Sequence, residues 1–471
     1  MKKLIVSLVI AFFGFCKMVS AQVAMPAFFS DHLVLQQQSN AKIWGTAIGK
    51  KEVKVRTSWD NQTYTTKPDD KGNWSVVVKT ASAGGPFTIS VSQQNKIVLQ
   101  DVLLGEVWLC SGQSNMDMPV KGYNNLPITN SMDILMEAPD PMLRLFKVDR
   151  KYATTPETNV KGVWQPADAG SVASFSVVGY QFASYLRKQL GVPVGMIQST
   201  WGGSPIEAWM DRQLVGDVLK DRIVENKAIS KAVHQTPGNL FNGMISPLVG
   251  YNIAGVIWYQ GEQNRHNYGD YLALQHAMVN SWRTKWNIGD WPFYLVQLAP
   301  MKYAAHEAYK VPLLREAQLK LPDTLNNAGV AVIIDAGEEK NIHPANKTVA
   351  SKRLAYLALA NTYHKKGFPA ASPTFRKMVM KNDTVLVHFN DIPLGLTTYG
   401  KPIKQFEIAG ADQIFYPATA VLVNDVVRLY SDKVKQPIAI RYAFKDWAVG
   451  ELYSVEGLPI SSFRTDNWKA R

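Results

Sequence analysis

The sequence predicts an α/β protein in which a mostly parallel sheet, covered by helices, lies between two β-rich end regions. Three observations predict this class. Short apolar runs alternate with helical stretches in the middle of the chain, short strand-like runs fill both ends, and the 471 residues are 46% hydrophobic and 19% charged. Such a composition supports large buried cores and excludes a disordered or collagen-like chain. Because a single core rarely exceeds about 250–300 residues, we expect two or three domains.

The first 21 residues have the composition of an export signal. Lys2 and Lys3 precede an apolar stretch at 4–15, and small residues at 19–21 precede Gln22. The apolar stretch is shorter than the roughly 20 residues that a membrane-spanning helix needs, so cleavage is favoured over a membrane anchor. Cleavage would remove three lysines and no acidic residue from a chain of formal net charge +13. We expect a secreted or periplasmic protein without a membrane span.

Cysteine count and charge pattern exclude several classes of protein. Cys16 and Cys110 are too few for a disulfide scaffold or a cysteine zinc site. The basic residues are scattered without a run of five, which favours an ordinary basic surface over a nucleic-acid partner. Charge alone leaves open an acidic glycan as partner. Neither a phosphate-binding glycine motif nor a histidine and carboxylate cluster with metal spacing occurs, so we expect no cofactor and no metal.

The N-terminal region, residues 22–103, is predicted to be a β-sandwich. Apolar and charged residues alternate at 53–56, and turn residues recur about every ten positions, as is typical of short antiparallel strands. The predicted strands are 41–44, 53–59, 62–66, 74–79 and 87–91.

The larger domain is predicted over residues 104–368. Its apolar runs lack polar alternation and therefore suit parallel strands buried on both faces. The predicted strands are 107–110, 194–198, 255–259, 293–298 and 330–335, and the predicted helices are 179–190, 268–286, 313–321 and 347–363. On the last helix Arg353 lies along an otherwise apolar stripe.

The C-terminal region, residues 369–471, is again β-rich. Turn signals at 382–383 and 410–412 separate its strand-like runs. The predicted strands are 375–380, 384–389, 405–408, 421–423, 426–430 and 438–442. The sequence leaves open whether they form their own sandwich or complete the N-terminal one.

Polar residues follow the predicted parallel strands at their carboxyl ends, where open α/β sheets bind ligands. Ser114 follows the first strand and Gly203 the second, Gln260 and Glu262 follow the third, and the last strand leads to His343. A hydroxyl, backbone donors, an amide, a carboxylate and an imidazole are therefore expected at one edge. These are the groups that acyl transfer requires.

Ser114 and His343 are the candidate nucleophile and base. A serine hydroxyl attacks well only when a base takes its proton, and the base needs an acceptor on its far nitrogen. His343 alone among the eight histidines follows a buried strand by a short loop and precedes a helix, with Pro344 suited to the helix entry. A lone serine is usually a turn residue and a lone histidine usually structural, so both assignments depend on the shared edge.

The remaining groups at this edge have less specific signals. Gly202 and Gly203 can bring backbone N–H groups close to an acyl oxygen, and the amide of Gln260 or Asn264 can add a donor. Glu262 is expected either to accept the imidazole proton or to close a hydrogen-bond network. Cys110, inside an apolar strand, is interpreted as a buried small hydrophobic residue.

Four sequence blocks resemble the sialate O-acetylesterase family of SGNH-type carbohydrate esterases. They are GEVWLCSGQSNMDMP at 105–119, STWGGSPIEAW at 199–209, WYQGEQN at 258–264 and IHPANK at 342–347. The resemblance covers nearly the whole mature chain, from FSDHLVLQ at 29–36 to GLPISSFRTDNW at 457–468.

This resemblance implies a flavodoxin-like three-layer SGNH domain and a cofactor-free serine esterase. It implies Ser114 as nucleophile and His343 as general base, with an oxyanion hole from the Ser114 N–H, Gly203 and Gln260. The expected substrate is an acetylated carbohydrate. Its sugar rings are expected near Trp201, Trp209 and Tyr259, although tryptophans at such positions belong to the core equally often.

The acid of the triad departs from the family pattern. Many relatives carry Asp two residues before the histidine, where this chain has Asn341, and an amide cannot stabilise an imidazolium as a carboxylate does. By resemblance to acetylxylan-type esterases the acid is assigned to Glu262, with Asp335 and Glu338 as fallbacks.

The expected function is that of a carbohydrate O-acetylesterase. Asn341 keeps open the alternative of a catalytically impaired glycan-binding protein of the same fold. An esterase for non-sugar esters would need a wider apolar groove than these motifs suggest. Acetyl groups of sialic acid, xylan, mannan and pectin are not distinguished, because sugar selectivity depends on loop geometry.

Overall fold

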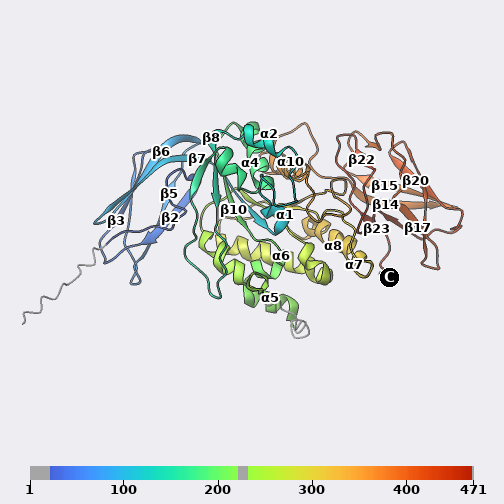
Figure 1. Cartoon of the computed structure of the whole chain (residues 1–471), viewed down its shortest axis with the longest axis horizontal. Coiled ribbons are helices and arrows are strands. Elements are labelled where there is room, and N and C mark those ends of the chain that lie inside the picture. Colours follow the sequence, from blue (N-terminus) through green and yellow to red (C-terminus); the bar gives the residue numbers. More distant parts are fainter. Residues whose placement is uncertain (1–21, 221–231, 469–471) are drawn as a thin grey trace, which may run out of the picture.

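The computed structural model describes residues 22–220 and 232–468. The molecule is elongated, with the N-terminal strands at one end, an α/β body in the middle and the C-terminal strands at the other end (Figure 1). The predicted export signal, residues 1–21, lies outside the described residues. Within the two described ranges, no helix combines the length and the hydropathy needed to cross a bilayer.

The N-terminal strands form two paired groups. Strand β2 (Asn40–Thr46) pairs antiparallel with β5 (Asn73–Lys79) along its whole length. Strand β3 (Val53–Thr57) pairs with β4 (Thr63–Thr66) and with β6 (Gly84–Ser92). The strict alternation of buried and exposed residues along β3 is the period-two pattern of a strand with one face on a core. All the strands predicted for this region are therefore confirmed.

One strand joins the N-terminal region to the α/β body. Strand β7 (Lys96–Gly112) is 17 residues long, and every residue from 102 to 112 is buried. Its first part pairs with β6 and with β1 (Val34–Gln36), and its last part lies inside the central sheet. The predicted domain boundary between residues 103 and 104 thus falls within a continuous strand.

The central sheet is parallel apart from one edge strand. Its order is β13-β12-β11-β7-β10-β8-β9, and only β9 runs antiparallel to its neighbour among the described strands. Without β8 and β9 at one edge, the order is the 2-1-3-4-5 order of flavodoxin-like sheets, whose ligand lies where the order reverses. Here that position is between β7 and β11. The bounds are β8 (Asp140–Lys147), β9 (Trp164–Ala167), β10 (Val194–Thr200), β11 (Gly255–Tyr259), β12 (Phe293–Val296) and β13 (Ala328–Ala331).

Helices cover both faces of this sheet. On β11, Val256 and Trp258 belong to the core under α6 (Tyr268–Trp286) and α8 (Lys310–Leu319). Ile257 and Tyr259, on the opposite face, belong to the core under α4 (Val177–Leu190) and α10 (Thr348–Leu357). The prediction of strands buried on both faces is confirmed, and α6 has the predicted bounds.

Strands β8 and β9 of the body were not predicted, and helix α10 differs from its prediction. Strand β8 begins at an Asp-Pro pair, which is typical of a turn, and its apolar run is interrupted by Arg144. Its sequence therefore resembles a loop, although Arg144 is buried. The charge of Arg144 is paired inside the protein, because its Nη1 lies 2.6 Å from the carboxylate of Asp101. Helix α10 also ends earlier than predicted and continues as a π-helical turn over Ala358–Thr362.

Shorter helices connect these elements. They are α1 (Ser114–Asp117), α2 (Ser131–Met136), α3 (Ala169–Ala173), α5 (Arg212–Leu219), α7 (Ala305–Ala308) and α9 (Leu321–Thr324). Helical turns also lie at Ile206–Trp209, Val233–Gln235, Phe241–Ile245, Ser246–Leu248 and Glu262–Asn267.

The C-terminal strands form sheets separate from the N-terminal ones, which answers the question that the sequence left open. One sheet has the order β14-β15-β20-β19 and another β18-β17-β21-β23. Phe375 of the first contacts Phe463 of the second, with ring centroids 4.9 Å apart. The bounds are β14 (Thr374–Lys381), β15 (Thr384–Asn390), β16 (Leu396–Thr397), β17 (Phe406–Ala409), β18 (Phe415–Pro417), β19 (Thr419–Val423), β20 (Val426–Tyr430), β21 (Ala439–Tyr442), β22 (Tyr453–Ser454) and β23 (Phe463–Arg464).

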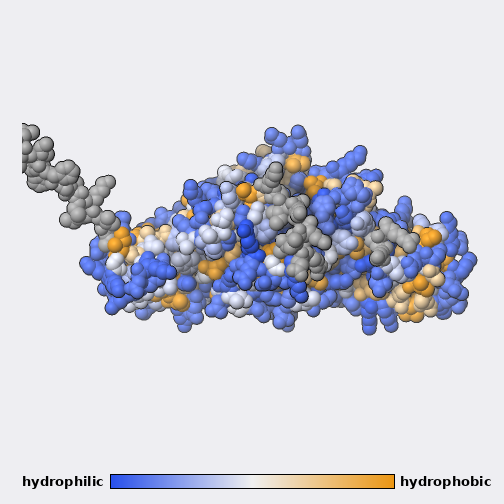
Figure 2. Space-filling view, turned by 90° about the horizontal axis from the view of Figure 1, so that it is seen from below, coloured by the Kyte–Doolittle hydropathy of each residue, from blue (hydrophilic) through white to orange (hydrophobic). Residues whose placement is uncertain are grey.

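A buried arginine fastens the C-terminal region to the body. Arg315 of α8 is completely buried, and its guanidinium donates to the carbonyl oxygens of Leu298, Lys445 and Asp446 at 2.7–3.0 Å. On the outer surface seen in Figure 2, small groups of hydrophobic side chains are separated by hydrophilic ones. Such scattered exposure is ordinary for a globular protein.

Candidate active site

Ser114 stands where the chain turns away from the end of β7. Gly112, the last residue of the strand, has φ +134°, and a Cβ atom there would lie 2.2 Å from the carbonyl oxygen of Tyr259 on β11. Only glycine fits this close approach. The N–H of Gln113 donates to the same carbonyl oxygen at 3.0 Å, and helix α1 begins at Ser114. Ser114 is half-buried, whereas Asn115 beside it is completely buried.

The turn after β10 packs directly against Ser114. A Cβ atom on Gly202 would lie 3.4 Å from the Cβ of Ser114, and the N–H of Trp201 donates to the carbonyl oxygen of Gly112 at 3.1 Å. Gly203 has φ +72°, and its carbonyl oxygen accepts a hydrogen bond from Gln235 at 2.9 Å. The structure therefore brings the predicted Gly-Gly segment to the predicted serine.

The turn after β11 is held by buried amides. Gln260 is completely buried, and its Nε2 lies within hydrogen-bond distance of Gln113 Oε1 (3.1 Å), Asn264 Oδ1 (2.7 Å) and the Ser204 carbonyl oxygen (3.2 Å). Asn264 Nδ2 in turn donates to Glu207 at 2.8 Å. The network ties together the turns that follow β7, β10 and β11. Because the acceptors within the protein occupy the amide hydrogens of Gln260, this side chain fixes the turns and does not offer a free donor.

The loop that carries His343 lies at the same edge of the sheet, although it is distant from Ser114 in the sequence. Nδ2 of Asn115 donates to the carbonyl oxygen of Ile342 at 3.0 Å, which joins the neighbours of Ser114 and His343. The loop is also braced internally, because Asn341 accepts from the N–H of His343 at 2.9 Å and donates to Glu338 at 3.1 Å. His343 is half-buried, and burial lowers the pKa of its imidazole below the ordinary 6.5.

A buried cluster of three polar side chains lies behind this contact. Oδ1 of Asn115 accepts a hydrogen bond from the ammonium of Lys347, and Nδ2 of Asn115 donates to Oε1 of Glu262. Burial lowers the pKa of Lys347 to about 7 and raises the pKa of Glu262. Burial therefore favours the neutral form of each group, while their mutual attraction opposes it. Asn115 is therefore hydrogen-bonded to an acidic side chain, Glu262, and to a basic one, Lys347.

The three carboxylates considered for the triad all have other partners. Glu262 bonds to Asn115, and Asp335 forms a two-pronged ion pair with Arg353 at 2.6 and 2.8 Å. Glu338 accepts from Asn341 and from the N–H of Ala345 at 2.5 Å. Among the described residues, none of these carboxylates forms a hydrogen bond with the His343 imidazole. In the part of the chain that the structure describes, no carboxylate forms a hydrogen bond or ion pair with the His343 ring.

The aromatic residues expected to contact sugar rings have different surroundings. Trp209 and Tyr259 are 0% and 1% exposed, so neither ring can stack on a sugar, and their prediction as substrate-binding residues is wrong. They instead pack in the cores on the two faces of the central sheet. Trp201 is half-buried beside Ser114 and stacks on His234, with ring centroids 5.4 Å apart.

Asp117 is a buried carboxylate close to Ser114 that the sequence did not single out. Its two oxygens accept from Thr200 at 2.6 Å, from Tyr123 at 2.8 Å and from Arg150. Arg150 in turn lies 5.8 Å from the ring centre of Trp201. The only available signal was the place of Asp117 one helical turn after Ser114. Lys347 had a similar signal, one turn after His343 at the start of α10.

The sequence also led to predictions about a reactive thiol and about metal-binding groups. Cys110 is completely buried, and desolvation raises the pKa of its thiol, which confirms its interpretation as a core residue. Across residues 22–220 and 232–468, no group of three or more His, Cys, Asp or Glu side chains is arranged to hold a metal ion.

Known proteins resemble this chain over most of its length. The sequence model for the carbohydrate esterase family called sialic acid-specific acetylesterase matches residues 104–363. The chain is 27% identical to the sialate O-acetylesterase of Rattus norvegicus, over 89% of this chain and 89% of the rat protein. It is 28% identical to the sialate O-acetylesterase of Homo sapiens, over 89% of this chain and 87% of the human protein.

A solved structure resembles nearly the whole chain. The crystal structure of a carbohydrate acetylesterase from Xanthomonas citri superimposes with a TM-score of 0.87 at 34% sequence identity, and the match covers 95% of this chain and 100% of that one. The likeness therefore extends over both terminal β regions as well as the α/β body.

Proposed function

Since the chain belongs to the sialic acid-specific acetylesterase family of carbohydrate esterases and is a carboxylic ester hydrolase, we propose that it removes O-acetyl groups from sugars through an acetyl-enzyme on Ser114. The body would then be an SGNH-type domain, with Ser114 at the point where the strand order reverses. The observation that carries the proposal is the bond from Asn115 to the carbonyl oxygen of Ile342, because it brings the neighbours of Ser114 and His343 together.

In the proposed first step, Ser114 Oγ attacks the acetyl carbonyl carbon while His343 takes its proton. We assign stabilisation of the developing negative charge on the carbonyl oxygen to the backbone N–H groups of Ser114 and Gly203. The close approach of Gly202 to Ser114 supports this assignment. His343 then returns the proton to the sugar oxygen as the ester C–O bond breaks. Water hydrolyses the acetyl-enzyme by the same route, with His343 again as base.

We propose that the buried cluster positions His343 and does not receive its proton. Glu262 and Lys347 hold Asn115 from both sides, and Asn115 holds the loop that carries the histidine. The low pKa of His343 keeps the imidazole neutral near pH 7, which is the form that a general base needs. Glu262 is thus assigned a positioning role through Asn115.

Acetate release from defined O-acetylated glycans tests the function. The panel contains O-acetylated sialic acid and acetylated xylan, mannan and pectin, each incubated with the protein and with the S114A variant. We expect acetate from at least one glycan with the parent protein and none with S114A. Equal release by both proteins would contradict the serine mechanism, and no release from any glycan would contradict the sugar substrate.

The sequence at 1–21 supports export as a further part of the proposal. Mass spectrometry of the protein from an expressing bacterium should find a mature chain that begins at Gln22, outside the cytoplasm. A full-length chain in the cytoplasm would contradict it.

A further inference from the structure

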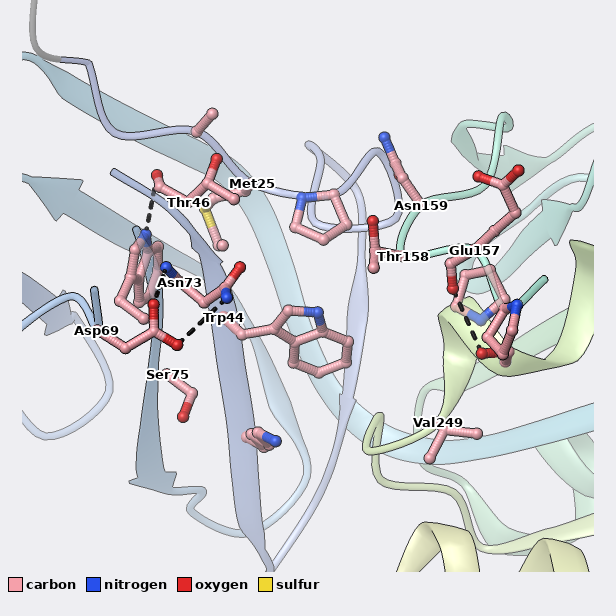
Figure 3. Close-up of a pocket in the computed structure, with 18 of the residues that line it drawn as sticks. Met25, Trp44, Thr46, Asp69, Asn73, Ser75, Glu157, Thr158, Asn159 and Val249 are labelled. Carbon is pink, nitrogen blue, oxygen red and sulfur yellow. Dashed lines mark hydrogen bonds between the residues drawn. The ribbon is translucent and has the colours of Figure 1, made fainter. Parts of the chain in front are cut away.

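A large cavity lies away from Ser114 and His343, between the N-terminal strands and the α/β body (Figure 3). Its volume is about 1150 Å³, and neither Ser114 nor His343 lines it. Pockets for small ligands usually measure about 300–1,000 Å³, so this cavity has room for more than one sugar ring. One wall comes from β2 and β5, and the other from residues 156–159 and 246–249.

An indole occupies the middle of the first wall. Trp44 is partly exposed at an outward-facing position of β2, opposite Ser75 of β5. Its ring is held from behind by edge contacts with Phe28 and Phe29, at centroid distances of 5.1 and 4.9 Å. Figure 3 shows Trp44 extending from β2 toward the wall that carries Thr158 and Val249. The ammonium of Lys42 lies 5.8 Å from the ring centre of Trp44. A rigid, partly exposed indole is suited to the apolar C–H face of a pyranose ring.

Hydrogen-bonding groups surround this indole and are held in place. Asn73 donates from Nδ2 to Asp69 at 3.2 Å, which leaves its Oδ1 as an acceptor. On the opposite wall, Asn159 accepts from the N–H of Ala27 at 2.9 Å, which leaves its Nδ2 as a donor. Fixed donors and acceptors beside an aromatic face match the vicinal hydroxyls of a sugar, because they cost little entropy on binding.

Small hydroxyl side chains complete the polar lining. Thr46, Ser75 and Thr158 are exposed, and within the described residues their hydroxyl groups make no hydrogen bond. They lie on both walls, with Thr46 and Ser75 flanking Trp44.

The charges in the cavity favour a neutral ligand. Three lysines and three acidic residues line it, namely Lys42, Lys67, Lys285, Asp69, Glu157 and Asp211. The charges are therefore balanced, and some are already paired, as for Lys285 and Asp211 at 3.6 Å. An acidic sugar would gain no net attraction here.

We propose that this cavity is a second, non-catalytic saccharide-binding site that holds a neutral stretch of a polysaccharide on the face of Trp44. The saccharide class rests on the proposed function. Residues 246–249 precede β11, whereas Ser114 follows the end of β7 in the same parallel sheet, so the two sites belong to opposite edges. When a long glycan is bound at one site, the effective concentration of its other segments at the second site is higher.

Isothermal titration calorimetry with neutral, unacetylated β-1,4-linked hexasaccharides of xylose, glucose and mannose tests this site. The variants are Trp44→Ala, Ser75→Tyr, which fills the space beside the indole, and the matched control Val77→Tyr. Val77 lies two residues further on the same exposed face of β5 and does not line the cavity. We expect at least one hexasaccharide to bind, with about tenfold or greater loss of affinity in W44A and S75Y and no loss in V77Y.

Other outcomes overturn the proposal. These are binding of no hexasaccharide, binding to S75Y as tight as to the parent protein, or binding of an anionic oligogalacturonate alone. S75Y decides the matter if loss of the Phe28 and Phe29 contacts unfolds W44A. All variants should hydrolyse 4-nitrophenyl acetate at the parent rate, so failure of the proposed esterase function would be seen separately from failure of this site.

Discussion

Asn115 donates a hydrogen bond of 3.0 Å to the carbonyl oxygen of Ile342, although the two residues are 227 positions apart in the chain. Each stands next to a residue of the proposed catalytic pair, Ser114 on one side and His343 on the other. A buried amide with charged partners on both sides is costly to leave unsatisfied, so this contact is a strong constraint on the geometry of the site.

Replacement of Ser114 by alanine should reduce hydrolysis of 4-nitrophenyl acetate by about 10⁴-fold or more, because no hydroxyl remains to form the acetyl-enzyme. Ser111→Ala is the matched control, since the Ser111 hydroxyl is buried and has no hydrogen-bond partner within the described residues. Initial rates and thermal melting should show both variants folded and only S111A active. An active S114A would remove the mechanism.

The acid limb of the kcat/KM profile should lie below pH 6.5. The base must be neutral, and burial lowers the pKa of His343, so protonation and loss of activity occur only as pH falls through that lowered value. The charge of Lys347 acts in the same direction. Lys347→Gln should therefore move the limb to higher pH, while the glutamine amide can still donate to Asn115.

Lys340→Gln is the control for this shift. Lys340 is exposed and only three residues from His343, so solvent and salt screen its charge. Its replacement should leave the pH profile in place. An unshifted limb in K347Q would show that Lys347 does not influence the base.

Asn115→Ala should lower kcat by about 100-fold, because the His343 loop loses its hydrogen bond and both buried charged groups lose a partner. Glu262→Gln keeps an oxygen that can accept from Asn115 and should cost only about tenfold. Loss of a true triad acid costs about 10⁴-fold. Steady-state kinetics of E262Q thus separate a positioning role from a direct one, and a 10⁴-fold loss would assign Glu262 as the triad acid.

Gly112→Ala should destabilise the protein by about 3 kcal/mol or more, because its Cβ would lie 2.2 Å from the carbonyl oxygen of Tyr259. Gly191, which also has a positive φ of +71°, has open space around it and serves as the control. Gly191→Ala should cost about 1 kcal/mol from backbone strain alone. Urea denaturation of both variants measures the difference, and equal costs would exclude the close contact.

The fold could be predicted where a local pattern reflects burial. The apolar runs at 255–259 and 293–298 correspond to strands covered on both faces, and the helical stretch predicted at 268–286 has the bounds of helix α6. Strand β8 was missed because its polar residues are satisfied by distant partners, as Arg144 is by Asp101. Local sequence does not reveal such partners.

The same limit applies to the site. The residues that follow strand ends could be predicted as site residues, because parallel strands bring their carboxyl ends to one edge of the sheet. The hydrogen bonds of Asn115 with Glu262 and Lys347 could not be predicted, because these residues become neighbours only in the folded chain. Trp209 and Tyr259 also show that an aromatic residue beside a motif does not indicate by itself whether its ring faces solvent or the core.

The continuity of β7 has a consequence for how this protein can be divided. A chain that began at residue 104 would start in the middle of a strand, and Leu104 and Gly105 of that strand would lose their partners on β1. Deletion of the N-terminal strands at this boundary would therefore cut through a strand of the central sheet. One continuous strand thus belongs to both the N-terminal strands and the central sheet, and it ends two residues before the proposed nucleophile Ser114.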